Sequence, residues 1–526
     1  MGHRIYRRKT VGDEQASGIG STSSPPVATP KATRWPLMPV GRWLVISVLL
    51  CLAFGLAARI WIFMGGLGDV NADEALVGLM ALHLLEGEWS TFFWGQSYGG
   101  TIDVILLAPV VALLGVTRMT LQVVPFLESI IATALVWAVS RRILGPGGGL
   151  TAAAVFWTFP AASVWWQTRQ SLLYLPVVIL GLVIVLCAQR IAEDSAPERS
   201  WLILGLAAGL GWWTSPQILY FLLPGCLWLL WKRPESVLRS GWVAIPAFVL
   251  GAAPWIITNV VDGWVSLTNI PDATDGPWER LIALVSGGMP MALGLYIPFH
   301  ETWIAPTVGP ILYIVGLAAL ILALALRRSS GAVHLWLLLA FPVLFVLIPA
   351  AAYVGSGRYF FFLAPSMAIT LGSLARRDTG RSILLAATTA LSAVGLYQMR
   401  DLPISFVPEV EPLVEVLEDS EVDHVVAGFW LAYKLTWETE EAVIASPTGV
   451  NRYPPYTDEI LGADSIAYVY NLYEQSQKDN ADVLREALGE MRIGFDEITT
   501  SNGYAVFIPD RAVTPDDVPS SALPMP

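Results

Sequence analysis

Acidic side chains lie next to long apolar sequence in the stretch from Asp69 to Asp103. Asp73 and Glu74 open a segment whose apolar residues recur at helical spacing, and Asn71 with Glu74 forms a capping-box pattern. Such a helix would lie in the membrane interface with its acidic end in water. A carboxylate there could remove a proton from a substrate held at the membrane surface. The alternative is a structural role, in which both acids only cap the helix.

Aromatic residues and glycines follow this predicted helix. The run from Trp89 to Trp94 is rich in tryptophan and phenylalanine, as expected at the depth of the lipid headgroups. Tyr98 and the two glycines after it predict a tight turn before Asp103. Acids beside an aromatic floor suit chemistry on a substrate whose tail lies in lipid.

The composition is that of an integral membrane protein. Of the 526 residues, 55% are hydrophobic and 14% charged, whereas soluble domains carry about 25% charged residues. The 22 tryptophans favour many crossings of the membrane interface. Cys51, Cys187 and Cys226 fall in apolar runs and predict no disulfide framework. The net charge is −12, and we expect no nucleic-acid partner.

Basic residues predict the orientation in the membrane. Residues 1–42 are basic and then rich in Ser, Pro and Gly, so we expect a disordered cytoplasmic N-terminus. Trp43–Phe63 is the first predicted span, and it lacks a small-residue cleavage site, which indicates an anchor. Residues 64–120, with Asp73, would then form the first extracytoplasmic loop.

The apolar run Val104–Val116 decides the rest of the topology. It has about thirteen residues, roughly 20 Å as a helix against a hydrocarbon core of ~30 Å. If it does not cross, the basic pairs after the later spans all lie inside, as the positive-inside rule requires. We therefore expect a juxtamembrane or re-entrant helix and about eleven spans within residues 43–398; one extra crossing is the alternative. The spans expected after the first are Leu121–Ser140, Thr151–Trp166, Leu172–Ala188, Trp201–Trp213, Ile218–Trp231, Trp242–Thr258, Thr307–Leu326, Val333–Ala352, Tyr359–Leu374 and Ile383–Tyr397.

This topology gathers polar residues on the outer face. Acids that can act as a base or metal ligand share that face with arginines that can hold phosphate. Glu128 lies inside a predicted span, as either an interface-near acid or a polar contact to the juxtamembrane helix. The outer-face candidates are Asp73, Glu74, Tyr98 and Asp103 in the first loop, Arg169 in the next turn, His300 and Glu301 in the long loop 259–305, and Arg358 and Tyr359 at the mouth of a late span.

The order of these features resembles the GT-C membrane glycosyltransferases of the protein-mannosyltransferase, aminoarabinose-transferase and RgtA-like group (glycosyltransferase family 39 and relatives). The likeness rests on Asp73-Glu74 after the first span, on WGQSYGGT before a short apolar run, and on Gly357-Arg358-Tyr359 ahead of Pro365. It implies a mostly α-helical fold, a polyprenyl-phosphate sugar donor and inverting transfer to a glycan, lipid or protein acceptor. The family's second-loop acid has no equivalent in QTRQSLLY.

The resemblance assigns Asp73 as general base, with Glu74 as helper or cap. Arg358 is the best candidate for holding the donor phosphate, with Arg169 second; Tyr359 and Tyr98 join them. An interface anchor is the alternative for Arg358.

Metal binding is the remaining question for the outer face. Asp103, His300 and Glu301 are candidate ligands of a divalent metal ion. Solvated loop ends are the alternative, because no metal-ligand spacing is present. No other cofactor is predicted.

After Tyr397 the sequence becomes acidic and lacks spans, and residues 399–513 predict a small extracytoplasmic α/β domain, parallel at least in part. The segment from Asn451 to Tyr456 is a Pro-stiffened loop that helps choose an acceptor or is an ordinary turn. Residues 514–526 are rich in Pro and Ser and are expected to be disordered. The predicted strands are His424–Phe429, Ala442–Ala445, Ile466–Tyr470, Phe495–Thr499 and Tyr504–Ile508, with helices at Pro408–Glu418, Trp430–Trp437 and Ala481–Met491.

The sequence thus predicts a multi-pass protein of the cell membrane, in contact with membrane lipids, whose active site and C-terminal domain are extracytoplasmic. Two other functions remain open. A lipid-linked sugar flippase or other transporter would favour polar groups near span centres and interrupted helix pairs, which the sequence does not show. A non-catalytic membrane scaffold with an outer binding domain predicts no loss of function when Asp73 is replaced.

Overall fold

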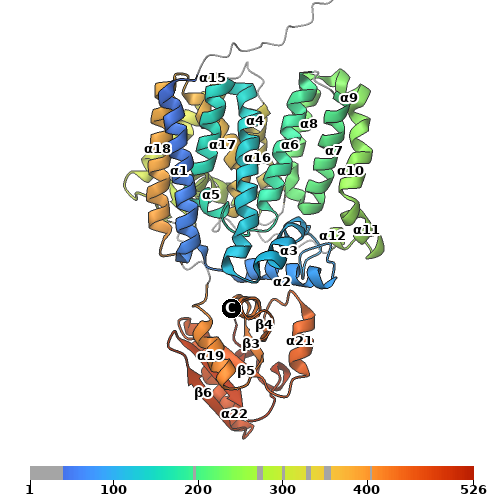
Figure 1. Cartoon of the computed structure of the whole chain (residues 1–526), viewed down its shortest axis with the longest axis vertical. Helices are drawn as coiled ribbons and strands as arrows, with labels where there is room; N and C mark the ends of the chain where they lie inside the picture. Colours follow the sequence, from blue (N-terminus) through green and yellow to red (C-terminus); the bar gives the residue numbers. More distant parts are fainter. Residues whose placement is uncertain are drawn as a thin grey trace, which may run out of the picture. The chain divides into compact units, whose positions relative to one another are not determined.

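Long apolar helices run side by side in the N-terminal part of the chain, as Figure 1 shows for α1, α4, α6, α7, α8 and α18. The computed structural model describes residues 40–193, 197–268, 276–298, 302–326, 333–348, 357–402 and 406–525. The N-terminal segment 1–42, which was expected to be disordered, therefore lies almost entirely outside the described residues. The bundle helices are α1 (Arg42–Met64), α4 (Arg118–Thr158), α5 (Ala161–Trp166), α6 (Tyr174–Ala192), α7 (Pro197–Thr214), α8 (Leu219–Lys232), α9 (Pro234–Ser240), α10 (Ala244–Gly251), α11 (Ala253–Val261), α15 (Gly309–Leu326), α16 (Val333–Leu347), α17 (Ala364–Leu374) and α18 (Asp378–Met399).

Each expected span coincides at least in part with these helices, and the chain is a multi-pass membrane protein. Among the described residues, four helices are long and apolar enough to cross a membrane by themselves: α1, α4, α6 and α18. The segment Pro234–Gly251 and α11, bent by 60°, would make a fifth. The total of about eleven spans stays a prediction.

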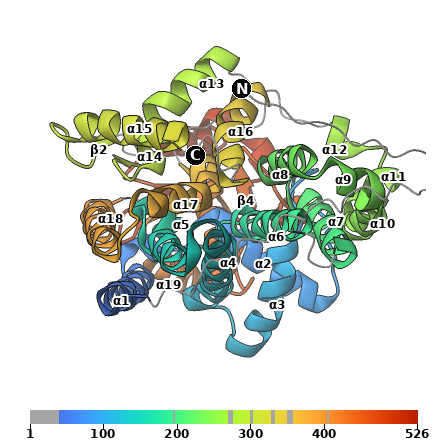
Figure 2. The same ribbon diagram turned by 90° about the horizontal axis from the view of Figure 1, so that it is seen from above.

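Helix α4 contains the break between two expected spans. Gly145 has φ +74°, a conformation that favours glycine, and the next residue, Pro146, cannot donate a backbone hydrogen bond. The helix therefore changes direction there. Figure 2, seen from above, shows α4 next to α5 and α17.

The stretch between α1 and α4 folds into α2 (Ala72–Glu86) and α3 (Ile102–Leu114). The predicted capping box is present: the Asn71 side chain accepts from the Glu74 amide, and Glu74 accepts from the Asn71 amide. Helix α2 ends at Gly87, which has φ +99°. It packs against α3, and α3 packs against α4. That α3 does not cross the membrane stays a prediction.

The segment expected to be one long loop contains short elements. These elements lie between α11 and α15, and in one of them, a β-hairpin, Tyr296 pairs with Trp303. His300 and Glu301 lie outside the described residues. The elements are α12 (Val265–Thr268), α13 (Pro277–Ala283), a π-helical turn (Leu284–Gly288), α14 (Met289–Ala292), β1 (Tyr296–Ile297) and β2 (Thr302–Trp303).

The C-terminal region contains a five-stranded sheet of order β4-β3-β5-β7-β6. Strand β3 is parallel to β4 and β5, whereas β7 is antiparallel to β5 and β6. Val425 faces one core together with Leu413, and Val426 faces the other with Leu484, as strand alternation requires. Each strand overlaps its predicted range. The elements are α19 (Glu411–Asp419), β3 (His424–Gly428), α20 (Phe429–Glu438), β4 (Ile444–Thr448), α21 (Pro454–Leu461), β5 (Ala467–Asn471), α22 (Gln475–Glu490), β6 (Phe495–Thr499) and β7 (Tyr504–Pro509).

The expected disorder after residue 513 is wrong for residues 514–525, which pack on this sheet. Val518 and Ala522 are buried in one of its cores. The carbonyl of Ala522 accepts from the Tyr470 hydroxyl, and the carbonyl of Leu523 accepts from Asn480. The composition misled because a few buried apolar residues and satisfied carbonyls are sufficient to order a proline-rich tail.

Candidate functional site

The two acids at the start of α2 have different surroundings. Glu74 is 4% exposed and forms a buried ion pair with Arg169. The Nε of Arg169 donates to one carboxylate oxygen at 3.0 Å, and Nη2 donates to the other. Since Glu74 also closes the capping box, both of its oxygens are engaged. Glu74 is therefore a buried anchor of the helix start.

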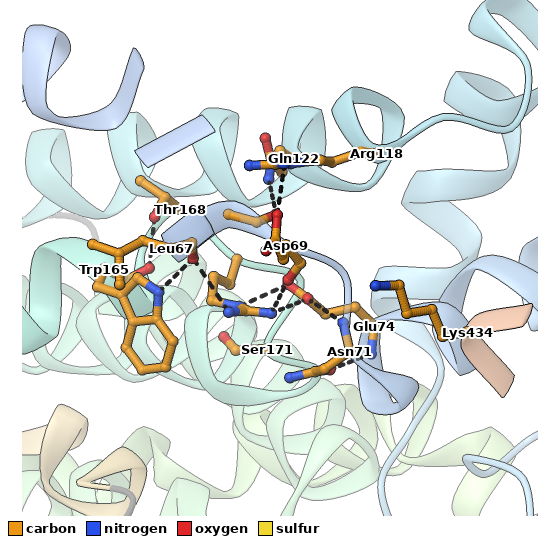
Figure 3. A network of polar contacts seen from close by, with 12 residues as sticks. Leu67, Asp69, Asn71, Glu74, Arg118, Gln122, Trp165, Thr168, Ser171 and Lys434 are labelled. Atoms are coloured by element: carbon orange, nitrogen blue, oxygen red, sulfur yellow. Dashed lines mark hydrogen bonds and ion pairs between the residues drawn. The ribbon is translucent and has the colours of Figure 1, made fainter. Parts of the chain in front are cut away.

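Arg169 also holds the chain that leads into α2. Its Nη2 donates to the carbonyl of Asp69 at 2.7 Å, and its Nη1 donates to the carbonyl of Leu67 at 3.3 Å. The indole of Trp165 donates to the same Leu67 carbonyl, and Asp69 pairs with Arg118 (Figure 3). Arg169 is 2% exposed, so the structure places this predicted phosphate ligand inside the protein, with its donors turned to Glu74 and the loop.

Asp73 instead faces Arg358. Its side chain is 29% exposed, and its Oδ2 lies 3.8 Å from the Nη1 of Arg358, whose side chain is 32% exposed. Arg358 begins the short helix η5 (Arg358–Leu363), directly after Gly357 with φ +71°. Its Nη2 donates to the Tyr359 hydroxyl at 3.4 Å. Three predicted site residues thus lie together: Asp73 from the start of the bundle sequence, and Arg358 and Tyr359 from near its end.

Tyr174, at the start of α6, joins this group. Its ring centroid lies 6.3 Å from that of Tyr359, and the residue is 8% exposed. Tyr174 also lies close enough to interact electrostatically with Arg358 and Asp73. Tyr174 was not among the candidates from the sequence, because nothing in its local sequence distinguishes it from other interface tyrosines.

The contacts of Tyr98 do not connect it to this cluster in the described part of the chain. The residue is 37% exposed, and within the described ranges it has no hydrogen bond to Asp73 or Arg358. A role for Tyr98 at the donor phosphate stays a prediction.

A small cavity adjoins the site along α2. Val77, one helical turn after Asp73, lines it together with Gln96, Asp103 of α3 and Leu173. The carboxyl of Asp103 faces Glu128 of α4, so the polar-contact interpretation of Glu128 is confirmed. The described part of the chain contains no group of three His, Cys, Asp or Glu side chains placed to hold a metal ion. His300 and Glu301, the other predicted ligands, cannot be placed because they lie outside it.

The C-terminal region contacts the loop that lines this cavity. Tyr453 stacks on Trp94 with ring centroids 3.9 Å apart, and Arg452 donates to the carbonyl of Gly95 at 3.4 Å. Gly95 has φ +66°, and a Cβ there would lie 2.8 Å from the Cα of Arg452. Trp437 of α20 packs equally closely on Gly78 of α2. The Pro-stiffened loop thus supports the first loop; acceptor choice by it stays a prediction.

His83, near the end of α2, joins the same two regions. Its Nδ1 lies 2.8 Å from Glu88 and its Nε2 lies 2.8 Å from Glu441, which precedes β4. Burial lowers the pKa of His83, but the hydrogen bonds to Glu441 and Glu88 outweigh it and raise the pKa to about 9. His83 is therefore a cation between two carboxylates at neutral pH.

Arg59 was missed by sequence reasoning. It lies fully buried in α1, donates to Gln167 at 2.7 Å and to the Trp157 carbonyl at 3.0 Å, and stacks on the Trp157 ring. The available signal was a lone arginine inside an apolar span, which is expensive unless partners await it. Arg59 fixes the turn that carries Arg169.

Comparisons with known proteins agree with this architecture. Residues 104–258 match the family model for dolichyl-phosphate-mannose-protein mannosyltransferase. No curated protein matches the sequence significantly. The apo crystal structure of ArnT from Cupriavidus metallidurans aligns with 92% of this chain and 99% of its own, at 10% identity and a TM-score of 0.60. ArnT from the same organism bound to undecaprenyl phosphate aligns over 92% and 99%, at 12% identity and a TM-score of 0.59. The chain has the fold of ArnT, and the predicted resemblance to the GT-C glycosyltransferases is confirmed at the level of the fold.

Proposed function

We propose that this chain is a membrane glycosyltransferase that moves a sugar from a polyprenyl-phosphate donor to an acceptor hydroxyl on the extracytoplasmic side. The family match and the structural likeness to ArnT, one of whose structures holds undecaprenyl phosphate, support the class of reaction. The observation that carries the proposal is the approach of Asp73 to Arg358, because it pairs a potential base with a potential phosphate ligand.

Asp73 acts as the general base. Its carboxylate is partly exposed and, among the residues that the structure describes, has no bidentate partner, unlike that of Glu74, so it can accept a proton from the acceptor hydroxyl. The acceptor oxygen then attacks the anomeric carbon of the sugar. The bond from that carbon to the phosphate oxygen breaks, and its electron pair leaves with the polyprenyl phosphate. A single displacement of this kind inverts the anomeric centre.

Arg358 stabilises the departing phosphate. A guanidinium offers several N–H donors in one plane, which match phosphate oxygens, and a third of this side chain is accessible. The hydroxyl of Tyr359 lies beside it, and Tyr174 lies against Tyr359. Donors aimed at the leaving oxygen lower the barrier because negative charge develops there in the transition state.

Glu74 and Arg169 position this machinery without touching the substrate. Their ion pair fixes the first turn of α2 to the turn before α6, which carries Tyr174. It also leaves Arg358 as the cation facing Asp73. We therefore assign Arg169 a positioning role in place of the phosphate-binding role expected from its sequence position.

The test is transfer by the full-length protein in membranes supplied with a panel of radiolabelled polyprenyl-phosphate sugars. The wild-type chain should form a glycosylated product from at least one donor. Asp73→Asn should lower the rate by roughly 10²–10⁴-fold, the range for a lost general base. Glu86→Gln is the matched control, because Glu86 is an exposed acid at the other end of α2. Equal rates for the two variants would refute the assignment of Asp73.

A further inference from the structure

Two carboxyl groups face each other in the interior between α3 and α4. Asp103 and Glu128 are each 5% exposed and interact directly. No cationic side chain in the described part of the chain pairs with either of them. Two buried carboxylates repel each other and are strongly disfavoured without a positive charge, so a cation or a proton must lie between them.

Buried side-chain oxygens of Asp103 and Gln170 have no hydrogen-bond partner of ordinary geometry in the part of the chain that the structure describes. By distance and angle, neither oxygen of Asp103 has a hydrogen-bond donor of ordinary geometry among the described residues; the polar side chains that act on it are the Gln170 amide and the Glu128 carboxyl. The side-chain oxygen of Gln170, which is 1% exposed and adjoins Asp103 from the turn before α6, likewise has no such donor among them. Buried acceptors without partners are rare in folded proteins and cost about 1–3 kcal/mol each.

The cavity beside α2 gives access to this point. Asp103 forms part of its wall, together with Gln96 and Gly99 of the first loop. Its volume is about 20 Å³. That is enough for one water molecule or one small ion, for which about 10–15 Å³ is needed, and too little for a sugar ring.

We propose that Asp103, Glu128 and the Gln170 amide oxygen bind a divalent cation of the Mg²⁺ or Mn²⁺ class. Carboxylate and amide oxygens are the ligands that such hard cations prefer, and Mg²⁺ commonly uses one or two carboxylates together with water. A shared proton would satisfy only one pair of oxygens. A cation satisfies the acceptors of all three side chains at once.

The ion would tie together three elements next to the helix that carries Asp73. Asp103 belongs to α3, Glu128 to α4 and Gln170 to the turn before α6. Val77 of α2 lines the same cavity. This site differs from the metal site expected from the sequence, which combined Asp103 with His300 and Glu301.

The test uses the purified full-length chain, stripped with EDTA, and Mn²⁺ as the probe. Electron paramagnetic resonance should show bound Mn²⁺ that Mg²⁺ displaces, and Mn²⁺ should raise the unfolding temperature. Asp103→Asn and Glu128→Gln should weaken Mn²⁺ binding by at least about tenfold. Glu235→Gln, at an exposed acid on α9, should bind as the wild type does.

Two results would overturn the proposal. The first is a wild-type chain that binds no Mn²⁺ and unfolds at the same temperature with and without it, while Asp103→Asn is equally or more stable, as a proton-sharing pair predicts. The second comes from Gln170→Glu, which remains informative if the other variants do not fold. This variant adds a carboxylate and should tighten Mn²⁺ binding, so an unchanged affinity would contradict the site. Since the readout is binding, its failure is distinguishable from failure of the proposed transferase activity.

Discussion

Glu74 and Arg169 form a buried bidentate ion pair, although 95 positions separate them in the sequence. This ion pair determines which side chains remain available to a substrate. With Arg169 committed to Glu74, the cation that faces Asp73 is Arg358. With Glu74 buried, Asp73 is the acid of this helix start that remains partly accessible.

Breaking this ion pair should destabilise the fold. Glu74→Gln or Arg169→Gln leaves the other charge buried without compensation, which costs about 3–5 kcal/mol. Thermal unfolding of the purified full-length protein measures the loss. Glu74→Gln with Arg169→Met should recover part of it, because no lone charge remains. Single variants as stable as the wild type would show that the pair does not anchor α2.

Replacement of Arg358 should weaken the handling of the donor while the fold is kept. Its side chain is one-third exposed and its approach to Asp73 is 3.8 Å, so little folding energy depends on it. We expect Arg358→Gln to lower kcat/KM for the polyprenyl-phosphate donor by roughly 10²–10³-fold, with Arg358→Lys intermediate. Steady-state kinetics in membranes test this. Unchanged kcat/KM in Arg358→Gln would place the phosphate elsewhere.

His83 should make the stability of the protein depend on pH. The pKa of His83 is about 9 in the folded protein, above its ordinary value of 6.5. The stabilisation is fully present below pH 6.5, declines as the unfolded chain alone loses its proton, and is lost above about pH 9. The difference between the two pKa values corresponds to a stabilisation of roughly 3 kcal/mol.

The free energy of unfolding, measured from pH 6 to 10, tests this dependence. His83→Gln should flatten the profile, whereas Glu440→Gln, at an exposed acid next to Glu441, serves as the control and should keep it. A wild-type profile that stays flat through pH 9 would contradict the charged bridge between His83 and the two carboxylates.

The contact between α2 and the C-terminal region should fail when Gly78 gains a side chain. A Cβ at Gly78 would lie 2.6 Å from the ring of Trp437, which is fully buried and cannot move away. Gly78→Val should therefore loosen this contact and expose the C-terminal region to limited proteolysis. Gly489→Ala is the control, because its Cβ would meet nothing within 4 Å. Equal proteolysis of both variants would contradict the contact.

Structural features that depend on interactions between neighbouring residues were predicted correctly from the sequence. The capping box at Asn71 and Glu74, the strands of the C-terminal sheet and the α20 crossover depend on neighbouring residues, and all were visible in the sequence. The family resemblance assigned Arg358 and Asp73 to the same predicted site. The partners of Glu74 and His83 were not visible, because each ion pair joins residues far apart in the chain. The tail was misjudged because composition does not reveal which few side chains find a core.

The most direct measurement of the central claim is the single-turnover rate of sugar transfer by Asp73→Asn, together with its affinity for polyprenyl phosphate. If Asp73 removes the acceptor proton, the rate falls roughly 10²–10⁴-fold while polyprenyl phosphate binds as it does to the wild type. A rate equal to that of the wild type, with the lipid bound normally, would contradict the claim.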